Sequence, residues 1–253
     1  MILHGAEAGD GAPVVLLHGL FGSQSNFGAL ARRLAVDYRV VSLDLRNHGG
    51  SPQGPGMTYA DMAEDIAETL DARGIGPAAL VGHSMGGKVA MRVALTAPTR
   101  IRRLLVADIA PVRYPPHFRT IAAAMQAIPL RPGLLRADAD AALQQSVLAP
   151  AVRGFLLQNL RFGSAPAWRI GLDHIARSLP DIEGWDAPAA TYDGPVLMLR
   201  GERSDYVQPE HRPAIRALFP RARFLALRDA GHWLHAEAPD AFLSVVQEFL
   251  SRE

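Results

Sequence analysis

The chain has no cysteine among its 253 residues, which excludes disulfide bonds, a thiol nucleophile, an iron–sulfur cluster and a thiolate zinc site. It also has almost no net charge, because 26 lysines and arginines face 25 aspartates and glutamates. Lys88 is its single lysine, and the arginines are scattered along the chain rather than gathered in a stripe. We therefore expect neither a nucleic-acid partner nor a polybasic membrane anchor.

Long hydrophobic runs are missing as well. No uncharged apolar run reaches the roughly 18 residues of a membrane-spanning helix, and residues 1–7 lack the basic and apolar segments of a signal peptide. The expectation is a soluble, cytoplasmic protein that does not act at a membrane. An apolar fraction of 49% and a charged fraction of 20% are typical of globular chains, so a sizeable core is available.

Short apolar runs alternate with longer stretches of helical periodicity, which is the pattern of parallel strands joined by crossover helices. This predicts an α/β fold with a mostly parallel, twisted sheet that is covered by helices on both faces. The predicted strands are residues 14–17, 40–43, 78–81, 104–107, 196–199 and 224–227. The predicted helices are residues 27–34, 59–73 with Thr58 as N-cap, 85–97 and 239–250.

The alternation stops between residues 107 and 196, where prolines punctuate several helical patches. We interpret residues 112–190 as a helical cap inserted into a core domain made of residues 1–111 and 191–253. Within this cap, apolar residues at helical spacing predict helices over residues 139–147 and 155–160, most simply for packing.

Residues Gly82-His83-Ser84-Met85-Gly86 fit the pattern Gly-x-Ser-x-Gly, with a predicted strand before it and a predicted helix after it. A sharp turn between strand and helix forces the serine into a strained conformation, which only glycine neighbours leave room for. Ser84 is therefore the candidate nucleophile, and the helix that follows it favours a developing oxyanion.

A serine hydroxyl needs a base, and nine histidines are available. His232 follows the last predicted strand and precedes the final helix, at the edge where an open α/β sheet carries its site. It is the predicted base. His235, three residues later, is the rival, and we expect it at the start of the helix beside Glu237 in a structural role.

Two aspartates could orient the histidine. Asp108 ends the strand before the cap, and Asp205 lies in a loop after residues 196–199, so both satisfy the order serine, acid, histidine. An orienting acid must be buried, and a strand end fits that requirement better than a charged loop. Asp108 is favoured, and Asp205 remains the alternative.

Residues 16–23 close the first predicted strand with a glycine-flanked turn, from which a backbone N–H can point at the space above Ser84. The N–H groups of Leu20 and Met85 are the predicted oxyanion donors, with Phe21 as the alternative to Leu20. The side chains of Leu20, Phe21, His83, Met85 and Trp233 are predicted to line the substrate pocket, although each could equally belong to the core.

These motifs resemble the α/β-hydrolase superfamily over nearly the whole chain outside the cap. Four segments together are similar to the small bacterial YbfF-type esterases: residues 18–23, 44–49, 82–88 and 108–112. The resemblance implies an esterase or thioesterase for small acyl groups, possibly acyl-CoA, and it implies that the acid is Asp108. One departure from the wider superfamily is Ser204, which occupies the position of the usual acid.

The predicted function is a serine carboxylesterase that cleaves a small-molecule acyl ester or thioester through an acyl-enzyme intermediate, with no metal and no cofactor. An acyl-CoA thioesterase, a lactone or C–C bond hydrolase on the same triad, and a binding protein without turnover are the alternatives. Arg113, Arg119 and Arg161 in the cap could meet CoA phosphates, but such arginines are usually solvated.

Overall fold

The structure is a computed structural model that describes residues 1–252, and its centre is a seven-stranded sheet in the order β1-β3-β2-β4-β5-β8-β9. β1 runs antiparallel to β3, and every other neighbouring pair is parallel. All six predicted strands are confirmed, each slightly longer than its apolar run. The strands are β1 (Gly5–Ala8), β2 (Ala12–Leu17), β3 (Tyr38–Leu43), β4 (Ala78–His83), β5 (Ile101–Ala107), β8 (Val196–Gly201) and β9 (Ala222–Leu227).

The sequence prediction missed β1. Its residues, Gly-Ala-Glu-Ala, include no β-branched or aromatic side chain and show no apolar alternation. The segment is extended because it pairs with β3, with Gly5 opposite Leu43 and Ala8 opposite Val40. Because this strand depends on pairing with β3, its own residues do not predict it.

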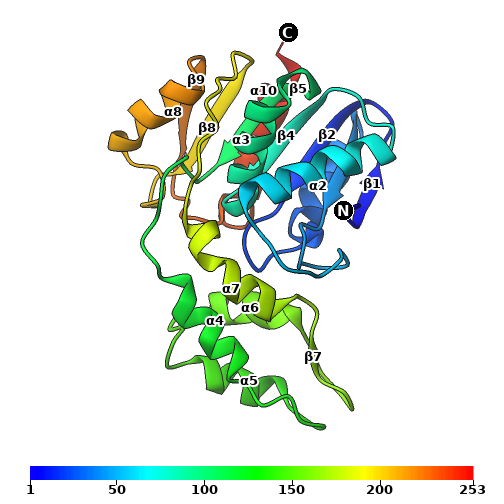
Figure 1. The fold of residues 1–253 in the computed structure, drawn as a ribbon, viewed down its shortest axis with the longest axis vertical. Coiled ribbons are helices and arrows are strands. Elements are labelled where there is room, and N and C mark those ends of the chain that lie inside the picture. The colour runs from blue at the N-terminus through cyan, green and yellow to red at the C-terminus, as the bar shows by residue number, and fades with distance from the viewer. Residues whose placement is uncertain (253) are drawn as a thin grey trace.

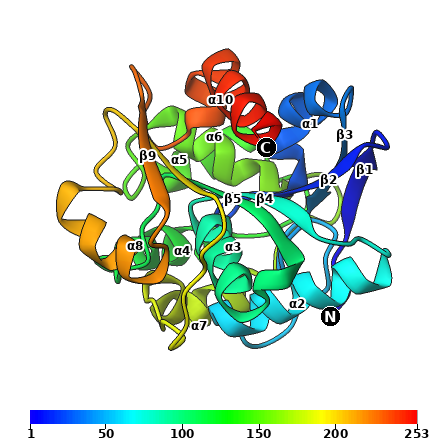
Figure 2. The same ribbon diagram turned by 90° about the horizontal axis from the view of Figure 1, so that it is seen from above.

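Helices cover both faces of the sheet (Figure 2). One face carries α1 (Gly28–Leu34) and α10 (Pro239–Ser251), and the other carries α2 (Tyr59–Ala72) and α3 (Met85–Thr96). Side chains of β2 alternate between these layers: Val14 and Leu16 pack on the first, and Val15 and Leu17 on the second. Burial on both faces explains why the strands read as continuous apolar runs.

The four predicted core helices are confirmed, and so is the N-cap of α2. The Thr58 hydroxyl accepts from the N–H of Asp61 at 3.1 Å, and the Asp61 carboxylate accepts from the N–H of Thr58 at 3.0 Å. Two further helices follow late in the chain, α8 (Arg212–Leu218) and α9 (Leu234–Glu237). Short 3₁₀ turns lie at Gln24–Phe27, Pro98–Arg100, Leu157–Asn159 and Pro209–His211.

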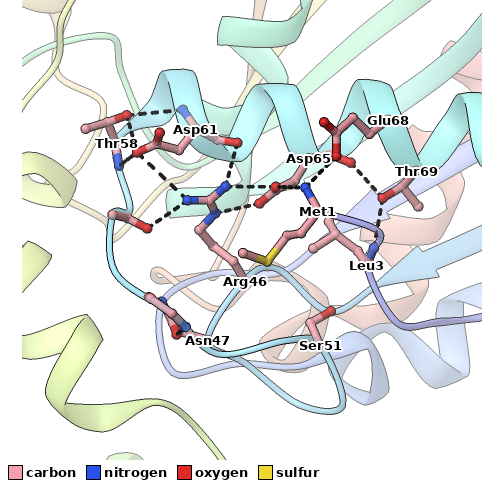
Figure 3. Close-up of polar contacts among 12 residues, drawn as sticks. Met1, Leu3, Arg46, Asn47, Ser51, Thr58, Asp61, Asp65, Glu68 and Thr69 are labelled. Carbon is pink, nitrogen blue, oxygen red and sulfur yellow. Dashed lines mark hydrogen bonds and ion pairs between the residues drawn. The ribbon is translucent and has the colours of Figure 1, made fainter.

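A buried ion pair fastens the loop after β3 to α2 (Figure 3). The Arg46 guanidinium donates to both oxygens of Asp65 at 2.5 and 2.8 Å, and the amino group of Met1 lies 2.6 Å from the same carboxylate. This fork-to-fork pairing is the geometry in which arginine binds a carboxylate most strongly. The ion pair fixes the loop that also carries His48, whose ring accepts from the N–H of Phe21.

The segment between β5 and β8 contains α4 (Phe118–Gln126), α5 (Arg136–Leu143), α6 (Pro150–Leu156) and α7 (Leu172–Glu183), with a small hairpin of β6 (Leu160–Arg161) and β7 (Ala167–Trp168). These helices gather at one end of the molecule (Figure 1). We call residues 112–190 the cap; these limits stay a prediction. Among residues 1–252, no helix combines the length and apolar character needed to cross a bilayer.

The two cap helices predicted from periodicity are wrong in their bounds. α5 ends at Leu143, before the end of the predicted range 139–147, and α6 begins at Pro150 and ends at Leu156. The residue before a proline avoids helical geometry, while the proline itself suits the first helical turn. Ala149 is therefore extended, and α6 begins at Pro150. The predicted range 155–160 therefore spans a helix end, a 3₁₀ turn and the start of β6.

Candidate active site

Ser84 lies at the turn from β4 to α3 in a strained conformation, with φ at +53°. The turn is possible only because its neighbours are glycines. A Cβ on Gly82 would lie 2.3 Å from the carbonyl oxygen of Gly86, and a Cβ on Gly86 would lie 2.3 Å from the carbonyl oxygen of Leu17. The Ser84 N–H donates to the carbonyl oxygen of Ala107 at 2.9 Å, which ties the turn to β5.

His232 lies within hydrogen-bond distance of the serine. Its Nε2 is 3.1 Å from Ser84 Oγ, and its Nδ1 is 2.7 Å from Asp108 Oδ2. The carboxylate can only accept, so Nδ1 carries the proton and Nε2 is free to accept from the serine hydroxyl. The ring of Tyr206 stacks on the imidazole, with 3.9 Å between centroids and 20° between planes.

Asp108 is fully buried directly after β5, again with positive φ, at +54°. Its Oδ1 accepts from the N–H of Gly201 at 3.1 Å, and its Oδ2 accepts from the hydroxyl of Ser204 as well as from His232. Three donors therefore compensate the buried charge. Ser204, the residue that the resemblance places at the usual acid position, donates its hydroxyl to the Asp108 carboxylate.

Asp205, the alternative acid, lies elsewhere. Its side chain is exposed, and its Oδ1 accepts from the amide of Gln208 at 3.3 Å. The structure thus brings Ser84, His232 and Asp108 together in one chain of contacts and leaves Asp205 outside it.

The backbone on both sides of His232 is held by two side chains. Glu237 accepts from the N–H of Gly231 at 2.7 Å and from the N–H of Trp233 at 3.1 Å. His83 Nε2 lies 2.8 Å from the carbonyl oxygen of His232 and donates to it. Burial lowers the pKa of His83 well below its usual range, which keeps the ring neutral and Nδ1 free of a second proton.

The predicted oxyanion donors differ in what they already bind. The N–H of Phe21 donates to His48 Nε2 at 3.0 Å, so it is engaged. Within residues 1–252, no protein acceptor takes the N–H of Leu20. Met85 is the first residue of α3, where an N–H has no partner inside the helix. These contacts favour Leu20 over Phe21 as the partner of Met85.

A family model described as the alpha/beta hydrolase fold matches residues 12–239. The chain belongs to this family. The match spans both halves of the sheet and the cap between them.

Individual relatives of this alpha/beta hydrolase agree with the family match. Esterase YbfF of Escherichia coli strain K12 is 41% identical over 245 residues, covering 96% of this chain and 94% of that one. The mouse sn-1-specific diacylglycerol lipase ABHD11 is also 41% identical, over 94% of this chain and 80% of its own. A solved structure titled "Marine microorganism esterase" has a TM-score of 0.95 at 33% identity, covering 98% and 99% of the two chains.

A cavity of about 380 Å³ opens at Ser84 of this alpha/beta hydrolase. Four of the five predicted pocket residues line it, namely Leu20, Phe21, His83 and Trp233, whereas Met85, at the start of α3, lines a smaller cavity. The cap supplies much of the wall, with the apolar side chains of Phe118, Ile121, Val147, Leu148, Val152, Phe155 and Leu156. The lining suits an apolar chain.

Sequence reasoning missed Tyr206, Ser204 and Glu237 as contributors to the site. In the sequence, Ser204 stands out only as the departure from the usual acid position and Glu237 only as a neighbour of His235, while nothing points to Tyr206. No spacing in the sequence relates these residues to Asp108 or His232, because the contacts arise where separate strand ends meet. Within residues 1–252, no cluster of three or more His, Cys, Asp or Glu side chains could hold a metal ion.

Proposed function

We propose that the chain is a serine carboxylesterase that hydrolyses small or short-to-medium acyl esters through an acyl-enzyme intermediate. The proposal is carried by the contacts from Ser84 through His232 to Asp108, with 3.1 and 2.7 Å between successive partners. The relatives named as an esterase and as a lipase support ester hydrolysis as the reaction.

In the first half of the reaction, Ser84 Oγ attacks the ester carbonyl carbon while His232 Nε2 takes its proton. Asp108 stabilises the resulting imidazolium and does not itself take the proton. The carbonyl oxygen becomes an oxyanion that accepts from the N–H groups of Leu20 and Met85. When the ester C–O bond breaks, His232 gives its proton to the departing alcohol, and the acyl group stays on Ser84.

In the second half, a water molecule takes the place of the alcohol. His232 Nε2 removes a proton from this water as its oxygen attacks the acyl carbonyl carbon, and the same oxyanion donors are used again. The bond to Ser84 Oγ then breaks, His232 returns the proton to the serine, and the carboxylic acid leaves. The acyl chain lies meanwhile in the 380 Å³ cavity, whose apolar wall favours a hydrocarbon over a charged group.

The test is initial-rate hydrolysis of p-nitrophenyl esters from acetate to palmitate, with matching acyl-CoA thioesters, by the wild-type chain and by Ser84→Ala. We expect a maximum among the short or medium esters and its loss in the variant, with a melting temperature within a few degrees of wild type. Turnover that survives in Ser84→Ala would refute Ser84 as the nucleophile. A higher specificity constant for the thioesters would instead make the enzyme a thioesterase.

A further inference from the structure

A second, smaller cavity of about 20 Å³ lies beside the nucleophile. It shares Leu20, Ser84, Phe118 and Tyr206 with the large cavity, so an ester held at Ser84 faces both. A space of this size holds about one water molecule, and therefore one oxygen-sized group of a ligand. Its other walls come from Tyr59, Met85, Lys88, Ile109, Tyr114, Ile182 and Glu183.

The first of its two charged side chains, Glu183, is the last residue of α7 and is only 2% exposed. Its Oε2 accepts from Arg119 at 3.1 and 3.2 Å. Its Oε1 is buried and has no hydrogen-bond partner among residues 1–252. Buried carboxylate oxygens nearly always have a donor, so this oxygen has an acceptor position to offer.

The second charged side chain is Lys88, which is 1% exposed. Its Nζ donates to the carbonyl oxygen of Val112 at 2.8 Å and to that of Gly184 at 2.6 Å. Burial lowers the pKa of Lys88 to about 7, so the ammonium form predominates below that pH. This ammonium has three N–H donors, and no oxygen within the described part of the chain takes the third. The cavity is thus bounded by one side chain with a free acceptor and one with a free donor.

We propose that this cavity, called the hydroxyl subsite, binds a hydroxyl group on the alcohol portion of the ester, which donates to Glu183 Oε1 and accepts from Lys88 Nζ. The inference rests on the proposed esterase function. A hydroxyl both donates and accepts, whereas a methyl group does neither and would leave Glu183 Oε1 without a donor and the third N–H of Lys88 without an acceptor. The acyl chain fills the large apolar cavity, so the alcohol is the portion left to reach the small polar one.

The subsite makes the enzyme selective for monoesters of diols or polyols over alkyl esters of the same size. Sites that hydrogen-bond a substrate hydroxyl reject the analogue lacking it much more strongly than apolar pockets reject a missing methylene. The probes are two isosteric pairs: 2-hydroxyethyl butyrate with n-propyl butyrate, and 3-hydroxypropyl butyrate with n-butyl butyrate. In each pair a hydroxyl replaces a methyl group, and the readout is the ratio of the two kcat/KM values.

We expect wild type to favour the hydroxylated ester of at least one pair by about tenfold or more. Glu183→Gln presents an amide in place of the carboxylate and should bring the ratio close to one. The matched control is Asp181→Asn, the same exchange of a carboxylate for an amide at an exposed position of α7 that lines neither cavity, and it should keep the wild-type ratio. A ratio cancels any loss of activity common to both esters of a pair.

The outcomes separate the subsite from the function on which it rests. Wild-type ratios near one in both pairs, with p-nitrophenyl butyrate still hydrolysed, would overturn the subsite and leave the esterase standing. An unchanged ratio in Glu183→Gln would overturn the role of Glu183. Absence of any ester hydrolysis by wild type would overturn the esterase proposal and the subsite with it. If Glu183→Gln does not fold, Glu183→Asp withdraws the carboxylate from the cavity and is expected to lower the ratio.

Discussion

At the scale of single residues, backbone strain is gathered around the proposed site. Phe21, Ser84 and Asp108 all have positive φ, between +53° and +59°, although none is glycine. Each such residue costs about 1–3 kcal/mol and persists only where its surroundings hold it in place. Here the N–H of Ser84 donates to Ala107 and the N–H of Asp108 donates to Leu199, so neighbouring strands hold both side chains at the carboxyl edge of the sheet.

The first prediction at this scale distinguishes the two candidate acids. Asp108→Asn should lower kcat by roughly 10⁴-fold, because an asparagine favours the wrong histidine tautomer and cannot stabilise the imidazolium. Asp205→Asn, which changes an exposed loop residue, should leave kcat within about twofold of wild type. Steady-state kinetics with p-nitrophenyl butyrate measure both, and the reverse order of sensitivity would make Asp205 the acid.

The second prediction concerns the two N–H groups that Glu237 accepts around His232. Glu237→Gln retains one oxygen but turns an amide nitrogen toward the other N–H, so the loop should shift and kcat should fall by roughly 10- to 100-fold. Glu202→Gln is the matched control, since Glu202 accepts from the N–H of Asp229 earlier in the same loop. Equal kinetics in the two variants would mean that Glu237 does not position His232.

The prediction of the site depends on local motifs. Ser84 is predicted because a turn with glycines on both sides can be recognised from five consecutive residues, and His232 because it follows a strand near the end of the chain. The hydrogen bonds by which Glu237 and His83 hold the backbone around His232 could not be predicted in this way. One of them joins His83 to His232, which are 149 positions apart, so it forms only when β4 and the loop that carries His232 lie side by side.

At the scale of elements, Lys88 joins α3 to two segments of the cap. Its Nζ donates to the carbonyl oxygen of Val112, where the chain enters the cap, and to that of Gly184, directly after α7. The rings of Tyr59 and Tyr114 lie 5.3 and 4.9 Å from the same nitrogen. α3 therefore begins directly after Ser84 and carries, one turn later, a side chain that makes two hydrogen bonds to the cap.

Lys88→Met is predicted to weaken the attachment of α3 to the cap segments that contain Val112 and Gly184. The variant removes both hydrogen bonds while retaining an apolar stem, so the bond from the N–H of Tyr114 to the carbonyl oxygen of Glu183 should open more often. Hydrogen exchange followed by mass spectrometry should show faster exchange in peptides that contain Tyr114. Thr96→Val is the control, because Thr96 lies on the same helix and its hydroxyl donates to the carbonyl oxygen of Arg92 within that helix. Equally slow exchange in Lys88→Met and wild type would contradict the prediction.

Elements were predictable where their residues carry their own pattern. The buried parallel strands can be predicted because each is a continuous apolar run. β1 has no such run and is extended because it pairs with β3. In the cap, periodicity indicated helices but misplaced their ends, because Pro150 rather than the apolar spacing sets where α6 begins. Nothing in the sequence predicts the hydrogen bonds of Lys88 to the cap, apart from the fact that Lys88 is the single lysine of the chain.

At the scale of the whole molecule, several histidines with buried or half-buried rings adjoin the proposed site. His18 and His48 each accept a backbone N–H at Nε2 and contact a backbone carbonyl at Nδ1, so neither can take a second proton without losing a bond. Burial lowers the pKa of His48 to about 3 and that of His235 to about 4, from 6.5. The folded chain therefore holds these rings neutral at pH values where the unfolded chain protonates them.

Stability should consequently decrease in mild acid. Because their pKa is lower in the folded state, these two histidines contribute stability that is fully present above pH 6.5 and is lost as the pH falls toward 4. Each adds a slope of up to about 1.4 kcal/mol per pH unit within this window. His235→Phe, whose ring would lie between Phe27 and Phe242, should reduce the slope by about that amount.

Urea unfolding at pH 7, 6, 5 and 4.5 measures this slope as a change in the free energy of unfolding. His174→Gln, at the surface of α7, is the control and should have the slope of wild type. A slope for His235→Phe that matches wild type would mean that His235 takes up its proton as readily in the folded chain as in the unfolded one.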